Sequence, residues 1–213
     1  MIEQVAAFLD RGGVAMWIIA ALSVLTVAVT LWKAWRFQIR GLWRKSGVTT
    51  ALIAWESGDD DAARATLQGR KGLRAGVILG AMTACLGIPD REDAKAETTR
   101  LASAALVEAR TGLRVLELVA TLAPLLGLFG TVLGMIEAFQ ALQEAGSRPD
   151  PAVLAGGIWE ALLTTAAGMG VAIIASVAHA WFDGTVERIQ TDLEDAATRV
   201  FVARPLTNRG RNR

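Results

Sequence analysis

Three long uncharged stretches constrain the fold of this chain more than any other feature. They cover residues 12–32, 118–136 and 161–182, which are 21, 19 and 22 residues long. An α-helix rises about 1.5 Å per residue, so each stretch is long enough to cross a hydrocarbon core of about 30 Å. The sequence therefore predicts an all-α integral membrane protein with three transmembrane helices.

Basic residues near the ends of these stretches predict the orientation of the chain. The loop at 137–160 contains only Arg148, whereas basic residues gather after the first and third stretches, at Lys33, Arg36, Arg40, Arg44, Lys45, Arg188, Arg199, Arg204, Arg209, Arg211 and Arg213. Because Lys and Arg resist translocation, we expect the N-terminus outside and the C-terminus inside. The first stretch exceeds the ~7 to 15 apolar residues of a cleavable signal, so we expect it to persist as a helix.

Charged residues make up 20% of the chain although the mean hydropathy is +0.38, so soluble segments must flank the spans. We expect a short periplasmic N-terminus at 1–13, a first span at 14–32 and a cytoplasmic helical region at 33–115. A second span at 116–136, a periplasmic loop at 137–157 and a third span at 158–182 follow. Residues 183–213 then form a cytoplasmic helix with an Arg-rich tail.

The cytoplasmic region shows several helix signals. Asp59 and Asp90 lie where N-caps are expected, and glycines at 69–72 interrupt the helical pattern. No proline occurs between Arg91 and Pro124, which favours one unbroken helix over 91–136. Apolar residues recur at helical spacing after Phe182, so the third span should also continue beyond the membrane. Two of the three membrane helices are thus expected to extend into the cytoplasm.

Small residues form a stripe within each of the last two spans. Gly127, Gly130, Thr131 and Gly134 occupy positions i, i+3, i+4 and i+7. In the third span the stripe contains Ala161, Thr165, Gly168, Ala172, Ser176 and His179. Helices in lipid associate through such residues because they let the backbones approach closely. We therefore expect Gly127, Gly130, Gly134 and Gly168 to be helix-packing residues.

Four polar residues in these spans have two possible roles. Thr131, Thr164 and Thr165 carry hydroxyls, and Glu160 lies at the outer end of the third span. Each hydroxyl can bond a carbonyl of its own helix, which would be purely structural. An ionisable residue in a membrane helix is by default a functional hypothesis, so a proton pathway is the alternative. The residues alone leave both interpretations open.

The rest of the sequence offers no chemistry of other kinds. Cys85 is the only cysteine, and no Cys/His spacing fits a metal site. A net charge of +1 gives no broad surface for nucleic acid. We predict no enzyme activity, catalytic residue, cofactor or metal, and expect only membrane lipid to contact the Arg-rich tail.

Two segments in consecutive spans carry a family resemblance. They are APLLGLFGTVLG at 123–134 and GGIWEALLTTAAG at 156–168, and a short outside loop joins them. This order resembles the MotA/TolQ/ExbB family of inner-membrane proton-channel subunits. The three predicted spans resemble ExbB and TolQ more than MotA, which has four. The chain departs from the family at Ile173-Ile174, where many members have a proline.

The resemblance implies a homopentamer in the bacterial inner membrane with single-span ExbD- or TolR-like partners in its pore. Thr131 and Thr165 would then be pore-facing hydroxyls, Glu160 an acid near them, and Thr164 an additional hydroxyl. The implied function is coupling of the proton motive force to a TonB- or TolA-like protein, as in ExbB-like biopolymer transport. A TolQ-like envelope or motility motor and a structural scaffold remain alternatives. A solute transporter is disfavoured, because three spans show no inverted repeat.

Overall fold

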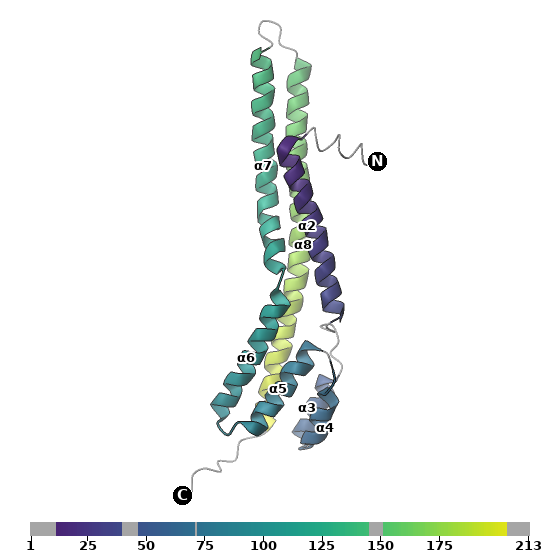
Figure 1. The fold of residues 1–213 in the computed structure, drawn as a ribbon, viewed down its shortest axis with the longest axis vertical. Coiled ribbons are helices and arrows are strands. Elements are labelled where there is room, and N and C mark those ends of the chain that lie inside the picture. Colours follow the sequence, from purple (N-terminus) through teal and green to yellow (C-terminus); the bar gives the residue numbers. More distant parts are fainter. Residues whose placement is uncertain (1–11, 40–46, 71, 145–150, 204–213) are drawn as a thin grey trace. The chain divides into compact units, whose positions relative to one another are not determined.

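Every regular element that the structure describes is an α-helix. The structure is a computed structural model that describes residues 12–39, 47–70, 72–144 and 151–203. The helices are α2 (Gly13–Ile39), α3 (Val48–Glu56), α4 (Asp60–Leu67), α5 (Leu73–Gly87), α6 (Arg91–Arg110), α7 (Leu113–Glu144) and α8 (Pro151–Ala203) (Figure 1). Most of the predicted N-terminal segment and of the Arg-rich tail lies outside the described residues, as do Arg40, Arg44, Lys45 and Arg148.

The chain divides into two compact units. The first unit comprises Met1–Trp32 and Gly112–Phe182, and the second comprises Lys33–Thr111 and Asp183–Arg213. Three helices, α2, α7 and α8, are long and apolar enough to cross a membrane. This agrees with the three predicted spans, while the orientation of the chain stays a prediction.

The first unit is built from α2, α7 and the part of α8 up to Phe182. Its core is a cluster of small and branched side chains from all three helices: Ile19, Val119, Ala123, Val171, Ala172 and Ala175. Many large apolar side chains of these helices are exposed instead, as expected for surfaces that face lipid or another subunit. The core therefore holds three helices together through small contacts.

The prediction of one unbroken helix over 91–136 is wrong. The chain ends α6 at Arg110 and begins α7 at Leu113. Between them, Gly112 adopts φ +86°, a left-handed conformation that glycine tolerates and other residues rarely adopt. A Cβ atom on Gly112 would also lie 3.0 Å from the Trp32 ring, so the turn packs closely against α2. Glycine, with no proline nearby, was sufficient to end the helix.

Helix α7 differs from the predicted second span at its other end. It contains Pro124 without ending there and continues past Ile136 to Glu144. Residues 137–144 are mostly good helix formers, with no glycine or proline among them, so nothing stops the helix. Together with the start of α8 at Pro151, most of the segment expected as a loop at 137–157 is helical.

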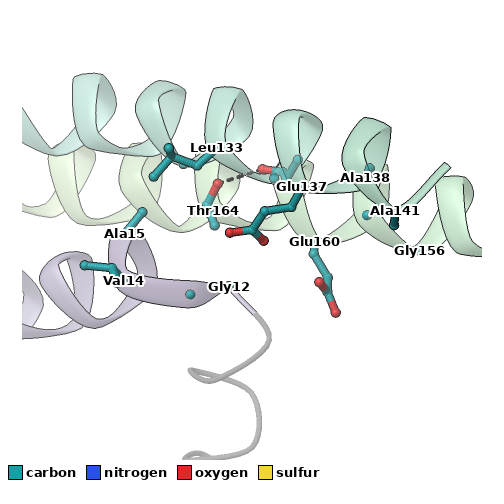
Figure 2. Close-up of a pocket in the computed structure, with 15 residues that line it drawn as sticks. Gly12, Val14, Ala15, Leu133, Glu137, Ala138, Ala141, Gly156, Glu160 and Thr164 are labelled. Carbon is teal, nitrogen blue, oxygen red and sulfur yellow. Dashed lines mark hydrogen bonds between the residues drawn. The ribbon is translucent and has the colours of Figure 1, made fainter. Parts of the chain in front are cut away.

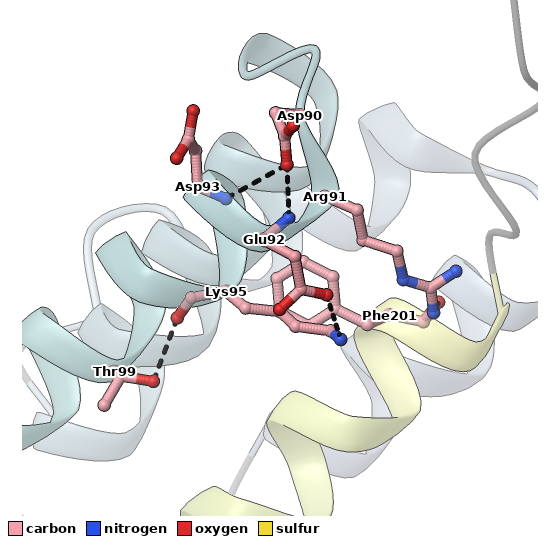
Figure 3. A network of polar contacts seen from close by, with 7 residues as sticks. All are labelled: Asp90, Arg91, Glu92, Asp93, Lys95, Thr99 and Phe201. Carbon is pink, nitrogen blue, oxygen red and sulfur yellow. Dashed lines mark hydrogen bonds and ion pairs between the residues drawn. The ribbon is translucent and has the colours of Figure 1, made fainter.

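Capping residues define the short helices of the second unit. The Asp59 side chain accepts a hydrogen bond from the Ala62 backbone amide and starts α4. Asp90 accepts from the amides of Glu92 and Asp93 and starts α6 (Figure 3). Such caps satisfy amides that have no partner within the helix. Both predicted N-caps are confirmed, as is the interruption before α5.

The second unit encloses the C-terminal part of α8. The side chains of this part that face the core are apolar and buried: Val186, Ile189, Leu193, Ala196 and Val200. The Trp55 indole donates to the Val200 carbonyl at 3.0 Å, and the Arg91 guanidinium donates to the Phe201 carbonyl at 2.8 Å (Figure 3). These carbonyls belong to the last turn, where helices lack their own donors. The predicted continuation of the helix after Phe182 is confirmed.

Lys33 is the one lysine that the structure buries within its described residues, with 1% exposure. Its ammonium donates to the carbonyls of Ala109 and Thr111 at the end of α6, and it lies 5.0 Å from the Phe37 ring centroid. A cation is favourable at a helix C-terminus, where carbonyls lack amide partners. Lys33 thus stabilises the end of α6 within the second unit.

Candidate functional site

The glycines expected to pack helices lie where α7 contacts α8. A Cβ atom on Gly127 would lie 3.0 Å from the Thr165 Cα, and one on Gly134 would lie 3.1 Å from the Ala161 Cβ. On the α8 side, a Cβ atom on Gly168 would lie only 2.5 Å from the Ala123 carbonyl oxygen. No side chain larger than hydrogen fits at Gly168 unless the helices separate.

Two neighbouring hydroxyls on α8 reach the same carbonyl on α7. The Thr165 hydroxyl lies 3.0 Å from the Gly127 carbonyl oxygen, and the Thr164 hydroxyl lies 3.2 Å from it. Thr164 also lies 2.7 Å from the carbonyl of Ala161 in its own helix. Thr164 is buried and Thr165 is half-buried. The two threonines therefore form the polar contact between α7 and α8 at this level.

Thr131 makes a different contact. Its hydroxyl donates to the Leu128 carbonyl of its own helix at 2.6 Å, and the side chain is half-buried. Along α7 it lies between Gly127, which is beside Thr165, and Gly134, which is beside Ala161. Thr131 and Thr165 are thus close in level along the helix pair, but the structure does not join them by a hydrogen bond.

A groove of about 370 Å³ lies beside these contacts in the first unit. Its walls come from the start of α2, the second half of α7 and the first turns of α8, and most of its lining residues are glycine or alanine (Figure 2). Thr164 lines the groove, whereas Thr165 does not. The small side chains leave room for water, since one water molecule takes up about 30 Å³ of liquid volume.

Two carboxylates line this groove, Glu160 from α8 and Glu137 from α7. Figure 2 shows the Glu137 carboxylate lying over the groove and the Glu160 side chain pointing away from α7. Sequence reasoning missed Glu137 because it placed this residue in a loop. The absence of a helix breaker after Ile136 could have placed it on α7, one turn after Gly134.

No group of three or more metal-ligating side chains occurs in the ranges that the structure describes. The hydroxyls, carbonyls and two carboxylates are groups that water and protons use. The arrangement therefore suits proton movement or helix packing.

Comparison with known proteins identifies the family. Residues 57–195 match the MotA/TolQ/ExbB proton channel family, which is well over half of the chain. The chain belongs to this family. Its relatives include a putative biopolymer transport protein ExbB-like 1 of Synechocystis sp., 35% identical over 167 residues, which are 78% of this chain and 65% of the relative.

Two further relatives match over shorter stretches. Biopolymer transport protein exbB1 of Vibrio cholerae is 40% identical over 87 residues, or 39% of this chain and 38% of the relative. Biopolymer transport protein ExbB of Pseudomonas putida is 35% identical over 129 residues, or 60% of this chain and 38% of the relative. The chain thus spans between about two fifths and two thirds of the length of these relatives.

Membership of the MotA/TolQ/ExbB family and three apolar helices make the chain a multi-pass membrane protein. The family is one of proton channels, not of enzymes. The matched range contains the whole α7–α8 contact, including Glu137, Glu160 and the three threonines. The site described above therefore lies within the family's shared region.

Proposed function

We propose that this chain is the channel subunit of an inner-membrane motor that couples the proton motive force to work at the outer membrane. Family membership and relatives named as ExbB biopolymer transport proteins support this proposal. The output would pass through an ExbD- or TolR-like single-span partner to a TonB- or TolA-like protein. The single observation that carries the proposal is the polar contact of Thr164 and Thr165 with Gly127, within otherwise apolar helices.

The proposed subunit works as a homo-oligomer, with five copies as the expected number. An exposed apolar stripe on α7 supports assembly, because its residues alternate at spacings of four and three: Leu118, Leu122, Leu125, Phe129, Val132, Ile136 and Phe139. This is the heptad spacing with which helices pack against one another over long distances. In the proposal the N-terminus is periplasmic and the C-terminus cytoplasmic.

The proton is held in transit by the partner in this mechanism. Residues 118–136 and 161–182 contain no acid, so these stretches offer no carboxylate of their own. Moving one proton through 100 mV is worth about 2.3 kcal/mol, which is lost if protons leak past. An aspartate in the partner's helix supplies the carrier, while Thr131 and Thr165 relay protons through water and Glu160 attracts them at the outer end.

The test measures proton flux into proteoliposomes that contain the chain together with its single-span partner. Thr131→Val and Thr165→Val remove the hydroxyls at nearly constant size and should abolish flux while the oligomer persists. Glu160→Gln should lower flux partially at low proton concentration outside. Thr121→Val is the control, because this exposed hydroxyl bonds only the Glu117 carbonyl of its own helix. Normal flux in both threonine variants would contradict the proposal.

A structural scaffold without proton conduction is the second candidate. The observation that favours it is the bond from the Thr131 hydroxyl to Leu128, because it leaves this threonine with a purely local role. A scaffold predicts no flux in the wild-type complex under any gradient. A TolQ-like or motility motor predicts the same flux as an ExbB-like one, so the neighbouring genes would separate these pathways.

A further inference from the structure

The two hydroxyls at Gly127 differ in the number of acceptors they can reach. Thr165 has one recorded acceptor, the Gly127 carbonyl at 3.0 Å. Thr164 has two, the Ala161 carbonyl at 2.7 Å and the Gly127 carbonyl at 3.2 Å. A hydroxyl has a single proton to donate. The shorter distances assign the Thr164 proton to Ala161 and the Thr165 proton to Gly127.

Thr164 cannot move away from this position. It is 2% exposed, and a Cβ atom on Gly130 would lie 2.6 Å from its hydroxyl oxygen and 2.8 Å from its Cβ. The same Gly130 Cβ would lie 3.0 Å from the Cβ of Ala15, so α2 closes the third side. Rotation of the Thr164 O–H bond needs no such space. Its proton is therefore able to turn from Ala161 to Gly127 while the side chain stays fixed.

We propose that Thr164 is a positioning residue that takes over the bond to Gly127 when the Thr165 hydroxyl leaves it for the proton pathway. This inference rests on the proposed function. The Gly127 carbonyl has a second lone pair beyond the one used by the α7 backbone. A donor from α8 on that lone pair keeps α7 and α8 tied together. With two threonines, one hydroxyl is released for proton transfer and the tie persists.

The first experiment measures the tie without any proton flux. Melting temperatures of the purified oligomer are compared for Thr164→Val, Thr165→Val and the double variant. Each single variant retains one donor to Gly127, so its melting temperature should fall slightly. The double variant loses both, so its fall should exceed the sum of the two. Additive falls would overturn the proposal, because they would mean that neither hydroxyl replaces the other.

A matched control sets the scale for this cycle. Thr26 in α2 is also buried, and its hydroxyl bonds only the Leu22 carbonyl of its own helix at 2.7 Å. Thr26→Val combined with Thr165→Val should give additive falls. Excess destabilisation in this control pair as well would show that any two lost hydroxyls are cooperative, and would equally overturn the specific role of Thr164.

The second experiment measures proton flux in the complex with the partner. Thr164→Val should lower flux roughly threefold, which corresponds to the loss of one average hydrogen bond between membrane helices. Thr164→Ser keeps the hydroxyl and should restore flux, whereas a packing role would leave it low. Equal flux in the valine and serine variants overturns the proposal. If the wild type carries no flux but the melting cycle is cooperative, the proposed function fails and the tie stands.

Discussion

The two units of this molecule are packed by opposite means. In the first unit, small residues such as Gly127 and Gly168 let backbones touch. In the second unit, large side chains such as Trp55 and Met82 are almost completely buried. Helix α8 shows both kinds within one continuous helix, with Ala161, Thr164 and Gly168 buried in the first unit and Val186, Ile189, Leu193 and Val200 in the second.

The difference teaches which solvent each unit is built for. Burial of a large apolar side chain is rewarded in water by roughly 25 cal/mol per Å². Between helices in lipid that reward is absent, since lipid is as apolar as the side chain, and close backbone contact takes its place. Polar contacts differ in the same way, with hydroxyls in the first unit and ion pairs such as Arg74–Asp192 at 2.8 Å in the second.

The largest expected effect comes from removing a large side chain of the second unit. Trp55→Ala should destabilise this unit by about 3–5 kcal/mol, because it leaves a cavity and removes the donor to Val200. Ile53→Ala on the same helix is the control, since Ile53 is 59% exposed. Hydrogen exchange of α3 and of residues 183–203 measures the loss. Equal protection in the two variants would break the comparison between the units.

The next effect comes from adding one methyl group to the first unit. Gly168→Ala should destabilise the α7–α8 contact by about 1–3 kcal/mol, because the new Cβ meets the Ala123 carbonyl at 2.5 Å. Gly170→Ala, two residues away, meets nothing within 4 Å and should be neutral or stabilising. Thermal unfolding in detergent separates them. If both variants melt alike, close contact at Gly168 does not hold the unit together.

The fold was largely readable from the sequence because its signals are local. Uncharged length predicted the three apolar helices, and Asp59 and Asp90 predicted two helix starts. The break at Gly112 was missed because a glycine inside a helical pattern is ambiguous, and only the contact with Trp32 decides it. The continuation of α7 to Glu144 was missed because the end of an apolar stretch was taken as the end of a helix.

The candidate site was less readable, since it depends on how two helices meet. Spacing singled out Gly127 and Thr165 but not their direct contact, which follows from the register between α7 and α8. The pairing of Thr164 with the same carbonyl has no signal within either helix alone. Whether Thr131, Thr165 and Glu160 carry protons stays a prediction.

A smaller effect is expected for the buried cation of the second unit. Lys33→Met keeps the apolar stem but removes the ammonium from the carbonyls of Ala109 and Thr111, which should cost about 1–2 kcal/mol. Lys95→Met is the control, because its ion pair with Glu92 at 2.8 Å is on the surface. Urea unfolding followed by Trp55 fluorescence measures the difference. A larger loss at Lys95 would show that burial does not govern ionic contacts in this unit.

The smallest expected effect concerns two surface ion pairs, whose comparison isolates the value of joining different helices. A hydrogen bond from the Arg199 guanidinium lowers the pKa of the Glu56 carboxyl, and one from Arg100 lowers the pKa of Glu97. A carboxyl with a lowered folded pKa contributes stability above its unfolded pKa and loses it as the pH falls through the folded value. Both contributions should therefore disappear on acidification below the ordinary range of a glutamate.

The two pairs differ in what they connect. Arg199–Glu56 joins α8 to α3 at 2.8 Å, whereas Arg100–Glu97 lies within one turn of α6 at 2.7 Å. We expect Glu56→Gln to lower the melting temperature at pH 7 slightly more than Glu97→Gln, because only the first pair ties elements distant in sequence. Both differences from the wild type should vanish at acidic pH and shrink in high salt, since exposed pairs are screened. A difference that persists at low pH would mean that the glutamate side chain contributes through packing, and the second unit would then depend on its apolar contacts alone.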